Sequence, residues 1–175
     1  MHAWSPEALV LDRIETPIGT ALVVTDERRV LRAFNWTDYE AAMRAWINKR
    51  YGYASLTEGE GPLRPQFAAY FAGDVDALST VPWEGAGTEF QKDVWTALCA
   101  IPVGETWSYA QLATHVNRPK AVRAVGLANG SNPVAVVVPC HRVIGSNGAL
   151  TGYGGGLHRK KWLLEHEGAT RNVTG

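Results

Sequence analysis

The 175-residue sequence is 46% hydrophobic and 19% charged with a net charge of zero, which excludes a disordered chain and suits one large or two small globular domains. No apolar run approaches the roughly 18 residues of a membrane-spanning helix, and two cysteines are too few for a disulfide framework. We therefore expect a cytoplasmic protein that makes no membrane contact.

The first third of the chain has the pattern of a small sheet with two helices. In chain order we expect a turn at 14–19, a strand at 20–25, a turn at 26–29, a strand at 30–34, a helix at 39–50, a polar loop at 53–61 and a helix at 65–72 that ends at Gly73. Residues 74–87 contain Pro82, Gly85 and Gly87 and indicate a connector.

Three helices are predicted after the connector. The first two begin with capping boxes, in which a hydroxyl residue (Thr88 or Ser108) is followed three positions later by glutamine. Pro119 suits the first turn of the third helix, which Gly130 closes. The expected ranges are 89–100, 108–115 and 119–129. Two short helices joined by a tight turn, like the second and third, are typical of a helix-turn-helix.

The zero net charge conceals two unlike parts. Residues 1–117 carry six more acidic than basic residues, whereas residues 118–175 carry six more basic than acidic residues. Such asymmetry indicates that the C-terminal part meets a polyanion, most simply nucleic acid. A solvated basic face is the alternative.

One segment places chemically active side chains next to each other. An apolar run ends at Pro139 and is followed at once by Cys140, His141 and Arg142. Cysteine is a good nucleophile only as a thiolate, and a neighbouring base or positive charge lowers its pKa toward neutrality. The segment therefore indicates a reactive cysteine at the end of a buried strand. The alternative is a small core residue, which is our interpretation of Cys99.

Motifs spread over residues 88–168 resemble those of the O6-alkylguanine-DNA alkyltransferases, also named methylated-DNA–protein-cysteine methyltransferases. The most specific of them is Pro139-Cys140-His141-Arg142-Val143. The others occur in order as Phe90-Gln91 to Val94-Trp95, Ile101 to Thr106, Ser108-Tyr109, Arg123 to Gly126, Asn132-Pro133, Thr151 to Gly156, Lys160, Trp162 to Leu164 and Glu167-Gly168. The N-terminal residues match more loosely, through Thr16 to Gly19 and Tyr70 to Gly73.

This resemblance implies an α/β protein with two domains. Residues 1–84 would form a small N-terminal α/β (ribonuclease H-like) domain with the connector, and residues 85–175 a mainly helical winged helix-turn-helix domain with the DNA-binding and active sites. The implied function is DNA repair: an alkyl group, mainly methyl, moves irreversibly from guanine O6 to Cys140 after the nucleotide is flipped. The implied partner is double-stranded DNA bearing O6-alkylguanine, bound through its minor groove by a monomer that needs no cofactor and no metal.

The resemblance assigns five residues to the catalytic set. Cys140 is the acceptor, and His141 its base. Adjacent side chains on extended backbone point to opposite sides, so a water is expected to bridge the two. Glu167 orients the histidine, Tyr109 supplies a phenolic proton toward the base ring, and Asn132 braces the turn before the cysteine.

Further residues are implied in binding. The base site comprises Val143, Tyr153, Gly154 and Lys160, and the DNA contacts comprise Arg123, Tyr109, Ala124 and Asn129. Arg123 would fill the space that the flipped nucleotide vacates; the alternative is a surface salt bridge. Tyr153 is alternatively a structural tyrosine, and glycine stands at 154 where the family often has serine, which affects the tolerance for bulky alkyl groups.

Three other functions stay open at this point. An alkyltransferase-like protein would bind alkylated DNA without chemistry, although such proteins replace the cysteine that this chain keeps at 140. A cysteine hydrolase would use Cys140 and His141 but needs an oxyanion hole that the sequence does not specifically supply. A plain winged-helix regulator would explain the helices and the charge but not the Pro-Cys-His-Arg motif.

Overall fold

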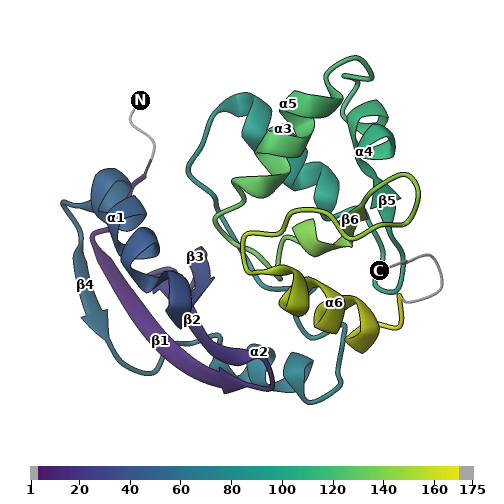
Figure 1. The fold of residues 1–175 in the computed structure, drawn as a ribbon. Coiled ribbons are helices and arrows are strands. Elements are labelled where there is room, and N and C mark those ends of the chain that lie inside the picture. Colours follow the sequence, from purple (N-terminus) through teal and green to yellow (C-terminus); the bar gives the residue numbers. More distant parts are fainter. Residues whose placement is uncertain (1–3, 170–175) are drawn as a thin grey trace. The chain divides into compact units, whose positions relative to one another are not determined.

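The computed structural model describes residues 4–169, and the chain divides into two compact units, Met1–Ala86 and Gly87–Gly175. Figure 1 shows strands β1 to β4 in the first unit and helices α3 to α6 in the second. No helix in the described part of the chain is long and apolar enough to cross a membrane.

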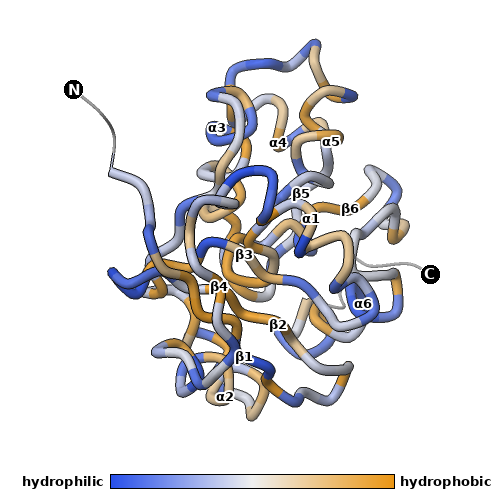
Figure 2. The backbone as a smooth tube through the Cα atoms, turned by 90° about the vertical axis from the view of Figure 1, so that its left-hand side faces the viewer, coloured by the Kyte–Doolittle hydropathy of each residue, from blue (hydrophilic) through white to orange (hydrophobic). Residues whose placement is uncertain are grey.

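The first unit is built on a four-stranded sheet with the order β3-β2-β1-β4. Its elements are β1 (Ala8–Thr16), β2 (Gly19–Asp26), β3 (Leu31–Trp36), η1 (Thr37–Tyr39), α1 (Glu40–Tyr51), β4 (Ser55–Glu58) and α2 (Arg64–Phe71). The first three strands pair antiparallel in sequence, whereas β4 pairs parallel to β1. Much of β2 is hydrophobic, orange in Figure 2, because it is a central strand that is buried on both faces.

The two helices of this unit cover opposite faces of the sheet. Met43 of α1 belongs to one buried cluster with Ala33 of β3. Phe67 of α2 instead stacks on Phe34, the next residue of the same strand, with ring centroids 5.5 Å apart. Successive side chains of a strand point to opposite faces, so α1 and α2 must lie on different sides.

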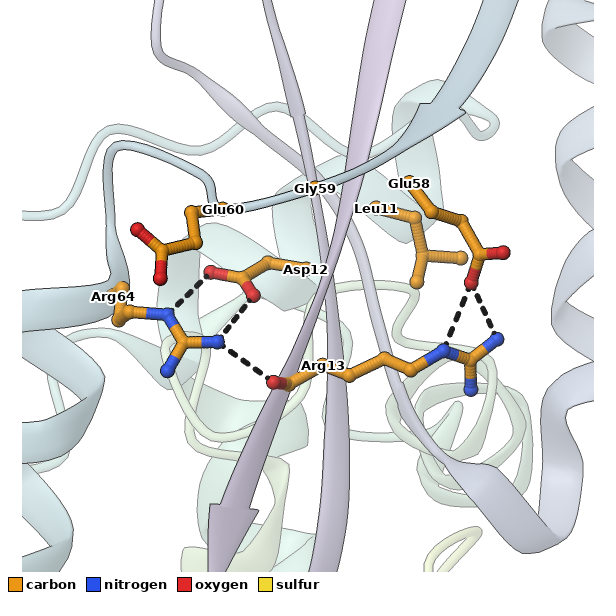
Figure 3. A pocket seen from close by; sticks show the side chains of 7 residues that line it. All are labelled: Leu11, Asp12, Arg13, Glu58, Gly59, Glu60 and Arg64. Carbon is orange, nitrogen blue, oxygen red and sulfur yellow. Dashed lines mark hydrogen bonds and ion pairs between the residues drawn. The ribbon is translucent and has the colours of Figure 1, made fainter.

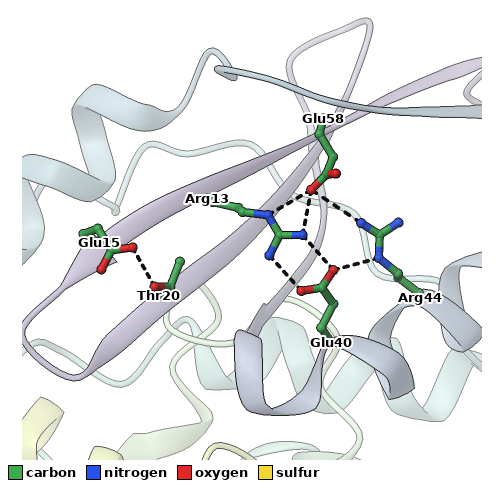
Figure 4. A network of polar contacts seen from close by, with 6 residues as sticks. All are labelled: Arg13, Glu15, Thr20, Glu40, Arg44 and Glu58. Atoms are coloured by element: carbon green, nitrogen blue, oxygen red, sulfur yellow. Dashed lines mark hydrogen bonds and ion pairs between the residues drawn. The ribbon is translucent and has the colours of Figure 1, made fainter.

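Charged pairs attach both helices to β1. Asp12 is only 2% exposed, and Arg64 of α2 donates to it at 2.7 Å (Figure 3). Arg13, the next residue, donates to Glu40 of α1 at 2.7 Å and to Glu58 of β4 at 2.6 Å (Figure 4). The side chains of Asp12 and Arg13 point to different faces of the sheet, as neighbouring residues of a strand must. Most residues that line the pocket in Figure 3 are charged, and two oppositely charged pairs among them, Arg64 with Asp12 and Arg13 with Glu58, are joined by hydrogen bonds.

Two strands differ from the sequence expectation. β1 was not predicted, and its last residues, 14–16, were expected to form a turn; β4 lies within the segment 53–61 that was expected to be a loop. In β1 the charged pair Asp12 and Arg13 interrupts the alternation of apolar and polar residues. β4 is a short polar edge strand. Both strands depend on partners distant in sequence, which local patterns do not reveal.

In its described part, the second unit contains four α-helices and a two-stranded parallel sheet of β5 and β6. Its elements are α3 (Glu89–Leu98), β5 (Trp107–Ser108), α4 (Tyr109–His115), α5 (Val122–Gly130), η2 (Cys140–Arg142), β6 (Val143–Ile144) and α6 (Leu157–His166). Both predicted capping boxes are present, at Thr88 and Ser108. Trp95 of α3 donates through Nε1 to the Ala128 carbonyl at 2.8 Å, which ties α3 to α5.

The third predicted helix begins later than expected. α5 starts at Val122, and Pro119 lies in the preceding turn rather than in the first helical turn. That turn follows Asn117, which has a positive φ of 59°, and is closed by the Ala121 amide bonding to the Arg118 carbonyl at 2.9 Å. Sheet and helices together give the predicted α/β class.

Candidate active site

Cys140 lies in a single turn of 3₁₀ helix, η2, and not at the end of an extended strand as the sequence suggested. The proline before it and the bond from the Cys140 amide to the Val138 carbonyl, at 2.8 Å, bend the chain here. The thiol is buried, with 6% of the residue exposed. The argument that Cys140 and His141 point to opposite sides of a strand therefore does not apply.

The imidazole of His141 is buried and oriented by a carboxylate. Its Nε2 lies 2.9 Å from Oε2 of Glu167, at the C-terminal end of α6. Because an ionised carboxylate only accepts hydrogen bonds, this contact places the imidazole proton on Nε2. Nδ1 is then the basic nitrogen, and it is a buried atom without a hydrogen-bond partner in the described residues. Nδ1 of His141 therefore has a lone pair that is available to accept a proton.

Arg142 also binds Glu167. Its Nε donates to Oε1 at 2.8 Å and its Nη2 to Oε2 at 3.1 Å, while Nη1 donates to the Ile101 carbonyl at 2.8 Å. The guanidinium is buried and makes the bidentate contact typical of arginine and carboxylate. Arg142 therefore has a structural position, joining the segment after α3 to the end of α6.

The protonation states follow from burial and charge. Burial is the main influence on Glu167, but the contacts with His141 and Arg142 together outweigh it and hold the pKa of the carboxyl well below its ordinary value. Burial lowers the pKa of His141, only partly opposed by Glu167, so the imidazole is neutral. Burial also raises the pKa of the Cys140 thiol, although the Asn132 amide and the charge of Lys160 act in the opposite direction. A protonated thiol of this kind needs a base before it can act as a nucleophile.

Asn132 closes the turn that leads into Cys140. Its Oδ1 accepts from the Val134 amide at 3.0 Å and its Nδ2 donates to the Val138 carbonyl at 2.8 Å. Between these two contacts Val136 has a φ of 73°, a left-handed conformation that strains a β-branched residue. The Asn132 side chain therefore connects two points of the turn before Cys140.

Lys160 is fully buried in α6 and holds two backbone carbonyls. Its Nζ donates to Val143 of β6 at 2.6 Å and to Thr151, in the loop before α6, at 2.7 Å. Burial lowers the pKa of Lys160 to about 8. The same loop carries Tyr153, whose buried hydroxyl has no partner in the described residues and whose pKa burial raises well above 10.

Residues 89–169 match the family model of the 6-O-methylguanine DNA methyltransferase DNA-binding domain. The chain is 49% identical over 164 residues to the methylated-DNA–protein-cysteine methyltransferase of Salmonella typhimurium, covering 91% of this chain and 96% of that relative. The chain belongs to the methylated-DNA–protein-cysteine methyltransferase family. The relative of the same name from Mycolicibacterium paratuberculosis is 45% identical over 88% of this chain and 89% of its own.

A solved structure agrees over nearly the whole chain. The crystal structure of Mycobacterium tuberculosis OGT in complex with DNA matches with a TM-score of 0.74 and 38% identity, covering 95% of this chain and 96% of that one. The resemblance found in the sequence is thereby confirmed, and the matched relatives of this methyltransferase family do not support the non-catalytic alternative.

The residues that the family resemblance assigns to DNA contact all lie in or next to α5. Arg123 and Ala124 are exposed, and Tyr109, the first residue of α4, packs its ring beside Gly126. Asn129 is only 4% exposed and has a buried Oδ1 without a partner in the described residues. It faces the interior of the unit together with Ala128, whereas Arg123 and Ala124 are exposed.

Two expectations about surface residues need correction. Some of the basic residues that give the C-terminal part its positive charge are not at the surface. Arg142, Arg159 and Lys160 are buried and form hydrogen bonds inside the unit. The surface charge of this methyltransferase near α5 comes instead from exposed cations such as Arg118, Lys120 and Arg123. Cys99, expected to pack in the core, is exposed at the end of α3 and donates to the Trp95 carbonyl at 3.6 Å.

Proposed function

We propose that this protein repairs double-stranded DNA by transferring the alkyl group of O6-alkylguanine, mainly methyl, to Cys140, once per molecule. The observation that carries the proposal is a buried thiol followed in sequence by a buried histidine. Nε2 of this histidine is bonded to Glu167, and Nδ1 has no partner in the described residues. Membership of the methyltransferase family supports DNA as the partner.

The transfer balances without a cofactor. By the relay that the family resemblance implies, the Cys140 proton passes through a bridging water to Nδ1 of His141, and the resulting imidazolium is stabilised by Glu167. The thiolate electron pair forms the new bond from sulfur to carbon, while the bond from carbon to O6 breaks and leaves its electron pair on guanine. Guanine then takes up one proton, so that the net exchange is a thiol proton for an alkyl group.

Tyr109 is the proton donor that we assign to the departing guanine, because a leaving anion is costly unless a donor meets its charge. We place the base against β6 and the following loop, with Val143, Tyr153 and Gly154 at its edge. Lys160 contributes indirectly, since its ammonium group holds the carbonyls of Val143 and Thr151.

The O6 atom lies inside the duplex, so the nucleotide must leave the stack at a cost of a few kcal/mol. We propose that α5 approaches the minor groove and that Arg123 fills the vacated space. Ala124 is small and exposed next to it, which leaves room for a close approach to the sugar-phosphate backbone. Asn129 would support this helix from inside the unit.

Intact-mass measurement after mixing the protein with a duplex that contains O6-methylguanine tests the proposal. We expect a gain of one methyl group on Cys140, at most one event per molecule, and no gain in Cys140→Ser. Continued turnover of substrate, or transfer that survives the loss of Cys140, would contradict the proposal. Tight binding without any mass gain would instead indicate a damage-binding protein.

A further inference from the structure

Thr151 connects three parts of the active-site unit. Its carbonyl accepts from the buried Nζ of Lys160 at 2.7 Å, and the same ammonium group donates to Val143, three residues after the nucleophile. The Thr151 side chain points to a different partner: its Oγ1 donates to the phenolic oxygen of Tyr109 at 3.0 Å. The backbone of Thr151 is thus fixed from inside, and its hydroxyl is free to hold a group at the surface.

We propose that Thr151 is a positioning residue for alkyl transfer, which holds the Tyr109 phenol so that the phenolic proton is left for the departing guanine. This inference rests on the function proposed above. It adds to that function a residue outside the catalytic set, in the loop that also carries Tyr153 and Gly154.

The chemistry of the contact supports this role. A phenol has one proton to donate and accepts hydrogen bonds on its oxygen. In the arrangement that we propose, Thr151 donates to the phenolic oxygen of Tyr109, 3.0 Å away, and leaves the phenolic proton unconsumed. Accepting a hydrogen bond strengthens a hydroxyl as a donor, and the same bond stabilises negative charge on the oxygen when the proton moves toward the base.

The contact also has a mechanical basis. Tyr109 begins α4, whereas Thr151 belongs to the loop before α6, and the two are 42 residues apart in sequence. Lys160 is buried and prevents the Thr151 carbonyl from moving, so a hydroxyl at this position returns the phenol oxygen to the same place. Valine has nearly the same shape but no hydroxyl, and serine keeps the hydroxyl without the methyl group.

The test compares single-turnover transfer by Thr151→Val, Thr151→Ser and the matched surface control Thr114→Val, an exposed threonine in α4. We expect Thr151→Val to lower the rate at saturating duplex roughly two- to tenfold, as the loss of one exposed hydrogen bond allows. The duplex dissociation constant should stay unchanged. The same factor should appear with free O6-benzylguanine, because the phenol acts on the base. Thr151→Ser and Thr114→Val should both react like the wild type.

A double-mutant cycle with Tyr109→Phe separates positioning from a merely structural effect. In the Tyr109→Phe background we expect Thr151→Val to change the rate no further, because the phenol oxygen is already gone. Losses that multiply in the double variant would overturn the inference, as would a wild-type rate in Thr151→Val. If that variant proves unstable in a thermal melt, Thr151→Ala in the same cycle gives the same two outcomes. A wild-type protein that gains no methyl group would instead overturn the proposed function itself.

Discussion

The carboxylate of Glu167 accepts hydrogen bonds from both His141 and Arg142, and all three side chains are buried. The contact between His141 and Glu167 could be anticipated from the sequence, because both residues belong to specific motifs of the family. The sharing of Glu167 with Arg142 could not be, since Arg142 reaches a carboxylate 25 residues away and a carbonyl 41 residues away. Such contacts exist only once the chain has folded.

Replacing Glu167 with glutamine should lower stability and transfer together. The substitution leaves the buried guanidinium of Arg142 without its counter-charge, which costs about 3 kcal/mol in the free energy of unfolding. The imidazolium formed during transfer also loses its partner, so the single-turnover rate should fall. Chemical denaturation and intact-mass kinetics measure the two effects, and a stable, fully active variant would contradict the assignment.

The pH dependence of the free energy of unfolding provides a second test of the role of Glu167. The pKa of Glu167 is lowered in the folded state, so its contribution to stability is present above its ordinary value of 4.5 and is lost as the pH falls below it. The difference in unfolding free energy between wild type and Glu167→Gln should therefore shrink below about pH 4.5. A difference that grows on acidification has the wrong sign for this account.

Arg123→Ala should separate duplex chemistry from base chemistry. Arg123 is exposed on α5, so its truncation to alanine leaves no cavity among the buried residues of the active site. We expect transfer from O6-methylguanine in a duplex to slow much more than transfer from free O6-benzylguanine, since only the duplex must release a stacked nucleotide. Equal losses on both substrates would mean that Arg123 has no part in extrusion.

At the scale of elements, the sequence predicted the helices whose starts depend only on residues within one turn. The capping boxes at Thr88 and Ser108 predicted two helix starts because each box uses residues within one turn. β4 was missed because its four residues are mostly polar and become a strand only by pairing with β1. The late start of α5 depends on the turn at Asn117, whose positive φ no local pattern indicated.

The attachment of the loop before α6 depends on one buried lysine. Lys160→Met removes the donor to the Val143 and Thr151 carbonyls and should lower the free energy of unfolding by about 2 kcal/mol, partly offset because no cation is then buried. Hydrogen exchange should show faster opening of this loop. Lys161→Met, at the exposed neighbouring position, is the control that should change neither quantity.

The pH dependence of the unfolding free energy tests whether Lys160 is responsible for this stabilisation. In the folded state the pKa of Lys160 is lowered to about 8 from its ordinary value of 10.5, so between these values the unfolded chain binds more protons. The wild type should therefore gain stability relative to Lys160→Met as the pH rises from 8 toward 10.5. A constant difference over this range would show that Lys160 does not titrate in the folded protein.

At the scale of the whole molecule, the division of charge along the sequence was informative, although three of the basic residues behind it are buried. Their charges serve internal contacts with carbonyls and with Glu167. The prediction of a polyanionic partner therefore rested on a count of basic residues that included buried as well as exposed side chains. Family membership, and not the count, now supports DNA as the partner.

The burial of Cys140 has a consequence for the protein after it has reacted. A methyl group added to sulfur enlarges a buried side chain, and overpacking of a buried site costs about 1 to 3 kcal/mol. We expect the methylated protein to melt at a lower temperature, by roughly 2 to 12 °C. Differential scanning calorimetry of a partly reacted sample should resolve two transitions, and a single unshifted one would contradict this. The melting temperature would then show whether a molecule has already reacted, and the fraction of methylated protein would give the number of lesions removed.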